Sequence, residues 1–354
     1  MKLILDNIIF SLQKAGGISG AWAMLINEYL KRPELNCFFI ERADAIGNIF
    51  RQDLNIPSSR ILTTTHLPLV ADRYMPLHLR EDADFIFHSS YYRYCPLPFA
   101  KNVVTLHDFI YEKAKSHSLI ARKIHSWQKR KAIANADAIV CVSHATQQDF
   151  QSRFKYIEKE TNVISNAAVC LPLPHSHSDS ERLKTGYVLY VGGRSGYKNF
   201  YTSVKATLIS EMPLVVAGSP LNHHERRFLA SLTPSLDYRV VCHPDRRELS
   251  QLYKNAFCLL YPTSFEGFGI PILEAQAHDC PVIISNCEAC IETAGDGALT
   301  SLSVSAESLA DKINLLKQSN IRAKVISRGR DNVTQFSWET IANDYIQLYS
   351  KLQK

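Results

Sequence analysis

Two glutamates eight positions apart, Glu266 and Glu274, belong to the stretch SFEGFGIPILEAQAHDCPVIIS, residues 264–285. The apolar run CLLYP before it is typical of a buried strand, and a helical pattern follows the glycines. Gly267 and Gly269 permit a tight turn, and the N-terminus of a helix presents unpaired N–H groups to an anion. Carboxylates repel phosphate but accept hydrogen bonds from sugar hydroxyl groups. The pattern therefore predicts a phosphate and sugar site, or alternatively a structural turn with one solvated glutamate.

A second stretch, YVLYVGGRSGYKNF, residues 187–200, combines an apolar strand with two glycines and two cations. The strand ends at Gly192 and Gly193, and Arg194 and Lys198 follow. Open α/β sheets bind ligands at the carboxyl ends of their strands, and a pair of cations there suits a diphosphate. The alternative is that both cations are solvated in a loop.

Residues 15–20, AGGISG, connect a short apolar strand to a helical pattern in the N-terminal half. Gly16 and Gly17 let a ligand approach the backbone closely. The segment can also be interpreted as a degenerate dinucleotide fingerprint, with Glu41 ending a second strand about twenty residues later. Because that fingerprint lacks its first glycine, we disfavour dinucleotide binding.

Two histidines end predicted strands: His107 follows VVTL and His88 ends FIFH. We expect both to face the ligand-binding edge of a sheet, where His88 would help to bind an acceptor, although a lone histidine more often packs or caps. Asp108 is expected to cap or orient, and is a further candidate for acceptor binding. Asp82–Ala83–Asp84 matches a DxD metal motif, but it precedes a strand instead of following one. We therefore predict no metal site.

These residues need elements to position them. Short apolar runs, typical of buried parallel strands, alternate with longer amphipathic stretches, and this alternation predicts a doubly wound α/β architecture. A segment rich in Pro, Ser and His, residues 171–186, is the expected linker between two Rossmann-like halves. The predicted strands are Leu3–Leu5, Cys37–Ile40, Phe85–His88, Val103–Leu106, Ala138–Val142, Tyr187–Val191, Leu214–Ala217, Ala256–Tyr261 and Pro281–Ser285. The predicted helices include Trp22–Leu30, Leu119–Ala134, Leu249–Asn255, Pro271–His278 and a last one capped by Ser337.

The composition excludes several classes of protein. The 354 residues suit two domains, and 46% hydrophobic with 21% charged residues exclude a disordered or collagen-like chain. A net charge of +6 is too small to indicate a nucleic-acid-binding protein. The nine cysteines are expected to be buried reduced thiols of a cytoplasmic protein, and the lone CxxC of Cys287 and Cys290 lacks a second pair for zinc. The sequence shows no signal peptide and no run long enough to cross a bilayer.

The order and spacing of these motifs resemble the GT-B glycosyltransferases of family 4, which are retaining enzymes that use nucleotide sugars. The resemblance covers nearly the whole chain, with the Glu–x7–Glu pattern at Glu266 and Glu274 and the Arg/Lys pair at Arg194 and Lys198. Further stretches similar to the family are VVTLHDF (103–109), ADAIVCVSHAT (136–146), GDGAL (295–299) and FSW (336–338). The resemblance implies an acceptor domain over residues 1–170, a nucleotide-sugar donor domain over 187–335, and a C-terminal helix, 336–354, that crosses back to the first domain.

The family's site residues carry over to matching positions. Arg194 and Lys198 would bind the donor's phosphates and stabilise the leaving diphosphate in place of a metal. Glu274 would bind the ribose, Glu266 the hydroxyl groups of the donor sugar, and His107 the sugar near its reacting carbon. The implied donor-binding set is Gly16, Gly17, Gly193, Arg194, Lys198, Glu266, Gly267, Phe268, Gly269 and Glu274.

Two positions depart from the family pattern. Asp279 stands where a glycine is usual, and Ile291 replaces the usual proline before Glu292. Both changes should alter loop geometry without removing a ligand, so they bear more on the choice of donor than on activity.

The resemblance implies transfer of a hexose from a nucleotide sugar to a hydroxyl group, without a metal cofactor and with retention of configuration. We expect GDP-mannose as donor and a surface polysaccharide or polyprenyl-linked glycan as acceptor. The alternatives are a UDP-hexose or UDP-HexNAc transferase, or a catalytically silent subunit that binds a glycan or partner. A basic helix at 117–134 with Trp127 could contact anionic lipids, which would make the protein cytoplasmic and peripheral at the inner membrane; solvation of that helix face is the alternative.

Overall fold

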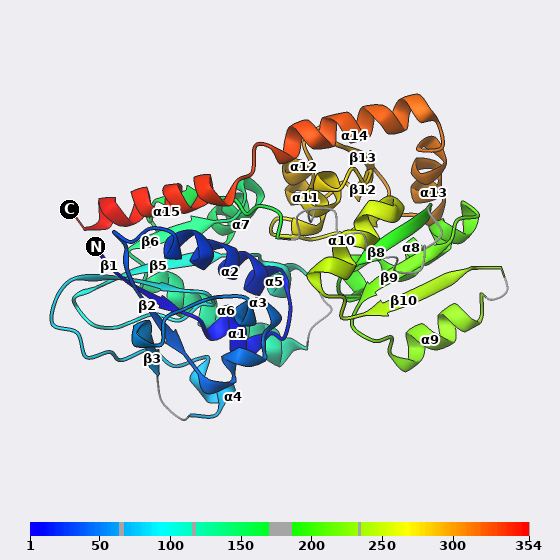
Figure 1. Ribbon diagram of the computed structural model, residues 1–354. Helices are drawn as coiled ribbons and strands as arrows, with labels where there is room; N and C mark the ends of the chain where they lie inside the picture. Colours follow the sequence, from blue (N-terminus) through cyan, green and yellow to red (C-terminus); the bar gives the residue numbers. More distant parts are fainter. Residues whose placement is uncertain (64–66, 115–117, 170–185, 233–234, 354) are drawn as a thin grey trace. The chain divides into compact units, whose positions relative to one another are not determined.

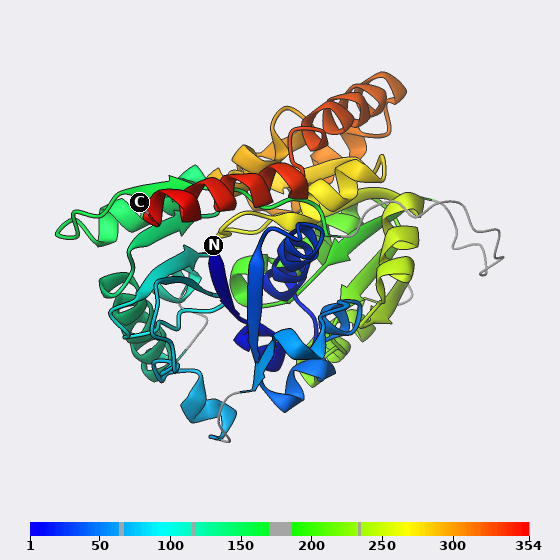
Figure 2. The ribbon, with the colours of Figure 1, turned by 60° about the vertical axis from the view of Figure 1, so that its left-hand side comes forward.

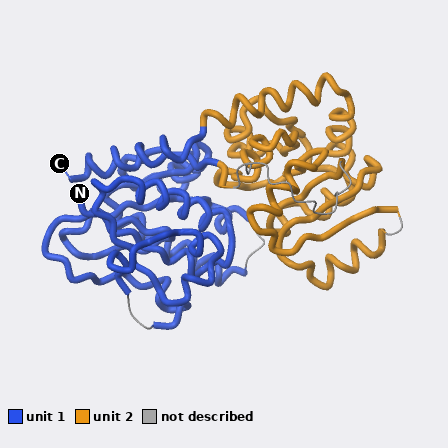
Figure 3. The backbone as a smooth tube through the Cα atoms, in the orientation of Figure 1, with its two compact units in different colours: residues 1–167, 336–354 blue, residues 168–335 orange. Residues whose placement is uncertain are grey.

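The computed structural model describes residues 1–63, 67–114, 118–169, 186–232 and 235–353. They form two compact units, one of Met1–Ala167 with Phe336–Lys354 and the other of Ala168–Gln335 (Figure 3). The predicted domain boundaries were 170 and 335. The predicted linker, 171–186, lies outside the described residues except for Gly186.

Unit 1 is built on a seven-stranded parallel sheet with the order β3-β2-β1-β4-β5-β6-β7 (Figure 1). The central strands are almost wholly buried, as their continuously apolar sequences predict. The strands are β1 (Lys2–Asp6), β2 (Asn36–Glu41), β3 (Ile61–Thr63), β4 (Phe85–Ser89), β5 (Ala100–Leu106), β6 (Ala138–Cys141) and β7 (Thr161–Val163). The helices are α1 (Ile8–Leu12), α2 (Gly17–Leu30), α3 (Ile49–Gln52), α4 (Leu69–Asp72), α5 (Ile110–Lys113), α6 (Leu119–Ala134), α7 (His144–Arg153) and α15 (Trp338–Leu352).

Unit 2 repeats the design with a six-stranded parallel sheet in the order β10-β9-β8-β11-β12-β13. Its strands are β8 (Tyr187–Val191), β9 (Leu214–Gly218), β10 (Tyr238–Cys242), β11 (Ala256–Tyr261), β12 (Val282–Ser285) and β13 (Ala298–Ser301). Its helices are α8 (Phe200–Ile209), α9 (His223–Ala230), α10 (Arg246–Asn255), α11 (Ile270–Ala277), α12 (Glu288–Ala294), α13 (Ala306–Leu315) and α14 (Ser319–Val333). The prediction of two Rossmann-like α/β folds is therefore confirmed.

Both sheets have a point where the strand order reverses. In unit 1 it lies between β1 and β4, and in unit 2 between β8 and β11. Loops at the carboxyl ends of such neighbouring strands diverge to opposite faces, which leaves a crevice where α/β proteins bind ligands. The Arg194–Lys198 loop follows β8 and the Glu266 loop follows β11, so the unit 2 candidates lie at this point.

The last helix, α15, packs against α2 of unit 1, and the two lie side by side in both views (Figures 1 and 2). The Ser337 side chain caps its start by accepting a hydrogen bond from the backbone N–H of Thr340, as predicted. Near its end, the Tyr349 hydroxyl lies 3.1 Å from that of Tyr29 on α2. In the described parts of the chain, no helix has the length and apolar character that a transmembrane span requires.

Candidate functional site

Lys198, Tyr261 and Glu266 form a compact cluster at the carboxyl ends of β8 and β11. Lys198 closes the short 3₁₀ turn Gly196–Lys198, Tyr261 is the last residue of β11, and Glu266 lies in the loop that follows. The Lys198 ammonium pairs with the Glu266 carboxylate and lies 3.0 Å from the Tyr261 hydroxyl, which donates to the same carboxylate at 2.8 Å. Burial, and then the neighbouring Glu266, raise the pKa of Tyr261 well above its usual value, so it remains a donor. The cluster holds a lysine and a carboxylate in one fixed geometry.

Arg194 lies four residues before Lys198 and is held from the side of α9. Its Nε is 2.9 Å from the Glu225 carboxylate, and Nη2 donates to the carbonyl oxygen of Pro220 at 2.7 Å. The side chain is only 5% exposed, yet its Nη1 has no hydrogen-bond partner among the described residues. A buried guanidinium N–H without an acceptor costs free energy, and a phosphate oxygen would satisfy it.

Glycines shape the loop that carries these cations. Gly192 has φ +109°, a left-handed conformation that a side chain would strain. Its carbonyl oxygen would lie 2.7 Å from a Cβ atom placed on Gly218, at the end of β9. Gly193 is exposed and has open space where a side chain would stand. The turn therefore packs closely against the end of β9 at Gly192 and leaves space for a ligand at Gly193.

The loop after Glu266 leads into helix α11. Gly269 is its N-cap with φ +109°, and Gly267 and Phe268 before it are buried. The carbonyl oxygen of Phe268 accepts a hydrogen bond from the Thr293 hydroxyl at 2.7 Å. These contacts fix the backbone of the predicted phosphate and sugar loop beside the Lys198 cluster.

Glu274 sits in a separate hydrogen-bonded group in the middle of α11. Its side chain is buried, with the residue 6% exposed, and accepts a hydrogen bond of 2.8 Å from the Tyr253 hydroxyl of α10. The ring of Tyr253 stacks on His278, whose Nδ1 lies 2.7 Å from the Glu274 carbonyl oxygen. Ribose binding by Glu274 stays a prediction.

In unit 1, the predicted glycine loop forms the start of helix α2. Gly16 is the N-cap and Gly17 the first helical residue of a fourteen-residue helix. The Ser19 hydroxyl donates to the Gly16 carbonyl oxygen at 3.0 Å, and a Cβ on Gly16 would collide with the Gln13 side chain. The exposed Gly17 presents helix-start backbone, as an anion site needs.

His107 comes directly after β5 and is half-buried. Its Nε2 donates to the Ser90 carbonyl oxygen at 3.2 Å, which leaves Nδ1 as an acceptor with no partner among the described residues. Burial lowers the pKa of His107 to about 4, so the ring is neutral at neutral pH. Asp108 caps the next turn by accepting from the Ile110 N–H at 3.0 Å, which agrees with the predicted capping role.

The prediction that His88 faces the ligand edge is wrong. His88 is 0% exposed, with Nδ1 2.6 Å from the Tyr349 hydroxyl and Nε2 2.9 Å from the Thr105 hydroxyl. Its ring packs edge-on against Trp22 at 4.9 Å. A histidine with both nitrogens bonded in the interior anchors α15 and cannot bind an acceptor.

The structure thus brings Lys198 together with Glu266 and places Arg194 on the same loop. Sequence reasoning missed Tyr261 and Glu225, the side chains that hold them. Tyr261 was visible as the last residue of a buried strand, and Glu225 as the fourth residue of a capping box that begins at Asn222. The exposed Asp82–Ala83–Asp84 segment is not joined by other ligands, since the described residues contain no group of three His, Cys, Asp or Glu that could hold a metal.

Two family models match this sequence over complementary parts. The model described as "Glycosyltransferase Family 4" matches residues 47–168, and the model described as "Glycosyl transferases group 1" matches residues 176–332. The chain belongs to glycosyltransferase family 4. It is thus an enzyme that transfers a sugar, and the predicted family is confirmed.

Solved structures show that this glycosyltransferase has the GT-B fold. It is similar to the sucrose-phosphate synthase of Thermosynechococcus elongatus, with a TM-score of 0.72 and 19% identity over 99% of both chains. It is also similar to Anabaena HepE in complex with UDP and glucose, with a TM-score of 0.69 and 17% identity over 99% of both chains.

Curated relatives include mannosyltransferases. The "O-antigen chain mannosyltransferase B" of Escherichia coli is 26% identical over 314 residues, which cover 80% of this chain and 81% of the relative. The "O-antigen chain mannosyltransferase RfbU" of Salmonella typhimurium is 25% identical over 211 residues, 57% of each chain.

Proposed function

We propose that this glycosyltransferase moves mannose from GDP-mannose to a hydroxyl group of a growing surface polysaccharide or lipid-linked glycan, with retention of configuration. The observation that carries the proposal is the buried Arg194 after the carboxyl end of β8, whose Nη1 has no acceptor among the described residues. The similarity to O-antigen mannosyltransferases over most of the chain supports the choice of sugar.

The donor's diphosphate would accept hydrogen bonds from Arg194 Nη1 and from the Lys198 ammonium. Lys198 is paired with Glu266, so a diphosphate would compete for that ammonium and free the carboxylate for sugar hydroxyl groups. The two cations would stabilise negative charge that grows on the leaving diphosphate, the task that a metal performs in other transferases. We therefore propose transfer without a metal cofactor.

The acceptor oxygen would attack the donor sugar from the face on which the diphosphate leaves. The bond from C1 to the phosphate oxygen breaks, a bond from C1 to the acceptor oxygen forms, and the acceptor proton passes to the leaving phosphate. In this scheme the neutral His107 offers Nδ1 to a hydroxyl of the donor sugar, while Gly16 and Gly17 allow a close approach of the backbone. The amides of Phe268 and Gly269 support the sugar and phosphate, and Glu274 binds the ribose.

The ribose assignment has its own test. Glu274→Ala should weaken nucleotide binding at least tenfold, because both ribose hydroxyls would lose an acceptor. Tyr253→Phe keeps the carboxylate and removes only the internal hydrogen bond, so it should bind nucleotide within a fewfold of the unchanged chain. Equal binding by Glu274→Ala and the unchanged chain would refute the role.

A UDP-sugar is the second candidate donor. It is favoured by the similarity to HepE, which was solved with UDP and glucose. The two candidates differ in both the nucleotide base and the sugar, so the donor that supports transfer distinguishes them.

We also propose that the protein acts at the cytoplasmic face of a membrane, through helix α6, on a lipid-linked acceptor. The helix carries five basic and no acidic side chains, and Trp127 on it is 50% exposed. A basic helix with exposed apolar groups suits an anionic lipid surface.

The deciding assay is sugar transfer followed by NMR. GDP-mannose, UDP-glucose and UDP-GlcNAc are each supplied with EDTA and a membrane extract as the source of acceptor. The proposal expects mannose transfer with the donor's α configuration retained. An inverted product would refute the mechanism, transfer from a UDP-sugar alone would select the second candidate, and no transfer from any donor would favour a silent subunit.

A further inference from the structure

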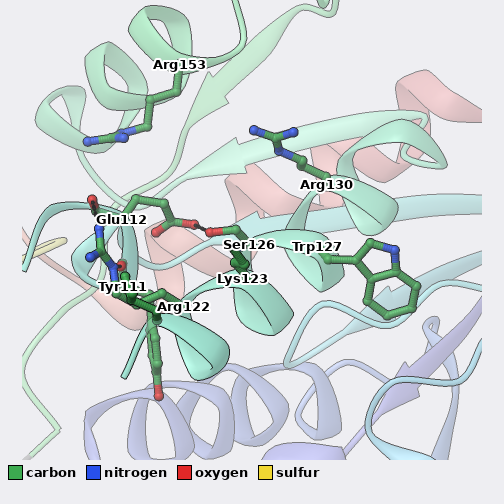
Figure 4. Close-up of a pocket in the computed structure, with 9 residues that line it drawn as sticks. Tyr111, Glu112, Arg122, Lys123, Ser126, Trp127, Arg130 and Arg153 are labelled. Carbon is green, nitrogen blue, oxygen red and sulfur yellow. Dashed lines mark hydrogen bonds between the residues drawn. The ribbon is translucent and has the colours of Figure 1, made fainter. Parts of the chain in front are cut away.

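A cationic pocket in unit 1 lies outside the donor site. It has a volume of about 500 Å³ and is formed by α5, α6 and the last residue of α7 (Figure 4). Four basic side chains line it together with a single carboxylate. The charged lining residues are Glu112, Arg122, Lys123, Arg130 and Arg153.

The single carboxylate, Glu112, already has partners within unit 1. Glu112 accepts a hydrogen bond from Ser126 at 3.1 Å, drawn dashed in Figure 4, and pairs with the buried Lys129 at 3.0 Å. Lys129 Nζ also donates to the Asp108 carbonyl oxygen at 2.7 Å, so the pocket floor is tied to the segment that follows His107. The pocket therefore adjoins the segment that is proposed to contact the substrates. Because Lys129 neutralises Glu112, the basic side chains that line the pocket give it a net positive charge.

Three of the lining cations are exposed to a ligand. Lys123 and Arg130 are exposed, and neither has a hydrogen bond or ion pair within the described parts of the chain. Arg153 is exposed as well, and its guanidinium lies 5.9 Å from the Phe109 ring. Arg122 instead supports the backbone by donating to the Tyr111 carbonyl oxygen at 2.9 Å.

Apolar side chains stand beside these cations on the same helix. Leu119 is 70%, Ile120 72%, Ile124 42% and Trp127 50% exposed. The spacing of Ile120, Ile124 and Trp127 puts them on one side of α6. Exposed aliphatic groups next to unpaired cations suit a lipid with a phosphate headgroup, because a soluble anion or a nucleic acid would leave them in water.

We propose that this pocket binds the diphosphate of a polyprenyl-linked acceptor while Leu119, Ile120, Ile124 and Trp127 enter the bilayer interface. Lys123, Arg130 and Arg153 supply three charges, which match a diphosphate diester better than the single charge of a phospholipid. The inference rests on the proposed function for the identity of the acceptor. The pocket would hold the lipid end, and the glycan would extend past Asp108 toward His107.

The test is vesicle flotation of the full chain. Neutral phosphatidylcholine vesicles are compared with vesicles that also contain a polyprenyl diphosphate, or phosphatidylglycerol at equal surface charge. The double variant Lys123→Gln/Arg130→Gln should bind the diphosphate vesicles about 30-fold more weakly, since each basic side chain contributes roughly fivefold near an anionic surface. Lys324→Gln/Arg328→Gln, an exposed pair on α14 with the same loss of charge, should bind like the unchanged chain.

Several results would overturn the inference. These are equal binding by the two double variants, equal affinity for phosphatidylglycerol and polyprenyl diphosphate vesicles, or stronger binding to an RNA oligonucleotide than to any vesicle. Trp127 gives an independent signal, because Trp22 and Trp338 are 5% and 7% exposed and should not respond. Vesicles should shift the emission to the blue, and Trp127→Phe should abolish the shift. Nucleotide affinity of Lys123→Gln/Arg130→Gln should be unchanged, so failure of the donor site would be seen separately.

Discussion

Charged side chains lie at the carboxyl end of an equivalent central strand in each sheet, β1 in unit 1 and β8 in unit 2, but their roles differ. At the end of β1 in unit 1, Asp6 forms a bidentate pair with Arg93, both contacts at 2.9 Å, and Arg93 also binds Asp72 at 3.0 Å. The Asp6 and Arg93 side chains are 1% and 2% exposed. At the end of β8 in unit 2, Arg194 Nη1 has no hydrogen-bond acceptor among the described residues, and the Lys198 side chain is 15% exposed. A charge whose partners are complete supports the fold, and one that lacks a partner points to a ligand.

The largest expected effect is the loss of stability when the buried ion pair of Arg93 is removed. Arg93→Ala leaves Asp6 buried without its cation and Asp72 paired with Arg42 alone, and it should lower the free energy of unfolding by about 3–5 kcal/mol. Urea denaturation measures it. Arg330→Ala, which removes an exposed pair with Asp279, is the control and should leave the urea midpoint nearly unchanged. Equal losses in the two variants would contradict the structural role of Arg93.

The next largest effect is expected on catalysis, when the proposed phosphate ligand Lys198 is removed. Lys198→Ala should lower kcat by about 10²–10³-fold through lost stabilisation of the leaving diphosphate, with little change in the unfolding midpoint. Steady-state kinetics with the active donor measures it. Lys205→Ala, an exposed lysine on the neighbouring α8, is the matched control. A fully active Lys198→Ala enzyme would refute the role.

A pH series sharpens the account of the unit 1 site. The folded pKa of His107, about 4, lies below the usual 6.5, so the unfolded chain binds more protons between these values and stability falls as the pH drops from 6.5 toward 4. The contribution of His107 should approach a slope of about 1.4 kcal/mol per pH unit and amount to roughly 1.5 kcal/mol between pH 6.5 and 5. His107→Gln should show a correspondingly shallower decline in denaturation experiments. Parallel curves would mean that His107 is not buried as a neutral ring.

The smallest effect concerns a departure from the family pattern. Asp279 has φ +58°, a conformation that favours the glycine usual in the family, but its carboxylate pairs with Arg330. Asp279→Gly relieves strain and removes an exposed ion pair, two effects of opposite sign on stability. Thermal denaturation should show nearly the same midpoint as the unchanged chain. A clearly lower midpoint would show that the pair contributes more than a surface contact does.

Central strands were predictable from the sequence and edge strands were not. All nine predicted strands exist, whereas β3, β7, β10 and β13, the edges of the two sheets, were missed. An edge strand is short and half exposed, as in the mixed burial of Tyr238–Cys242, so it lacks the continuous apolar run that marks an interior strand.

Positions in the site were easier to predict than partners. Glycine turns and strand ends located Arg194, Lys198 and Glu266, because local sequence sets both. The partner Glu225 comes from helix α9 and the partner Tyr261 from strand β11, so no local pattern links them to the loop after β8. His88 was misjudged for the same reason, since the helix that buries it begins 250 residues later. Contacts between distant segments decide whether a strand-end residue is free to bind.

The central claim is that Arg194 and Lys198 bind a nucleotide diphosphate without a metal. Calorimetric titration with GDP, UDP, ADP and CDP in EDTA, repeated with magnesium, tests it most directly. We expect saturable binding of one nucleotide, GDP first, with an affinity that is equal with and without magnesium and at least tenfold weaker in Arg194→Gln. Binding that requires magnesium, or that Arg194→Gln leaves unchanged, would contradict it.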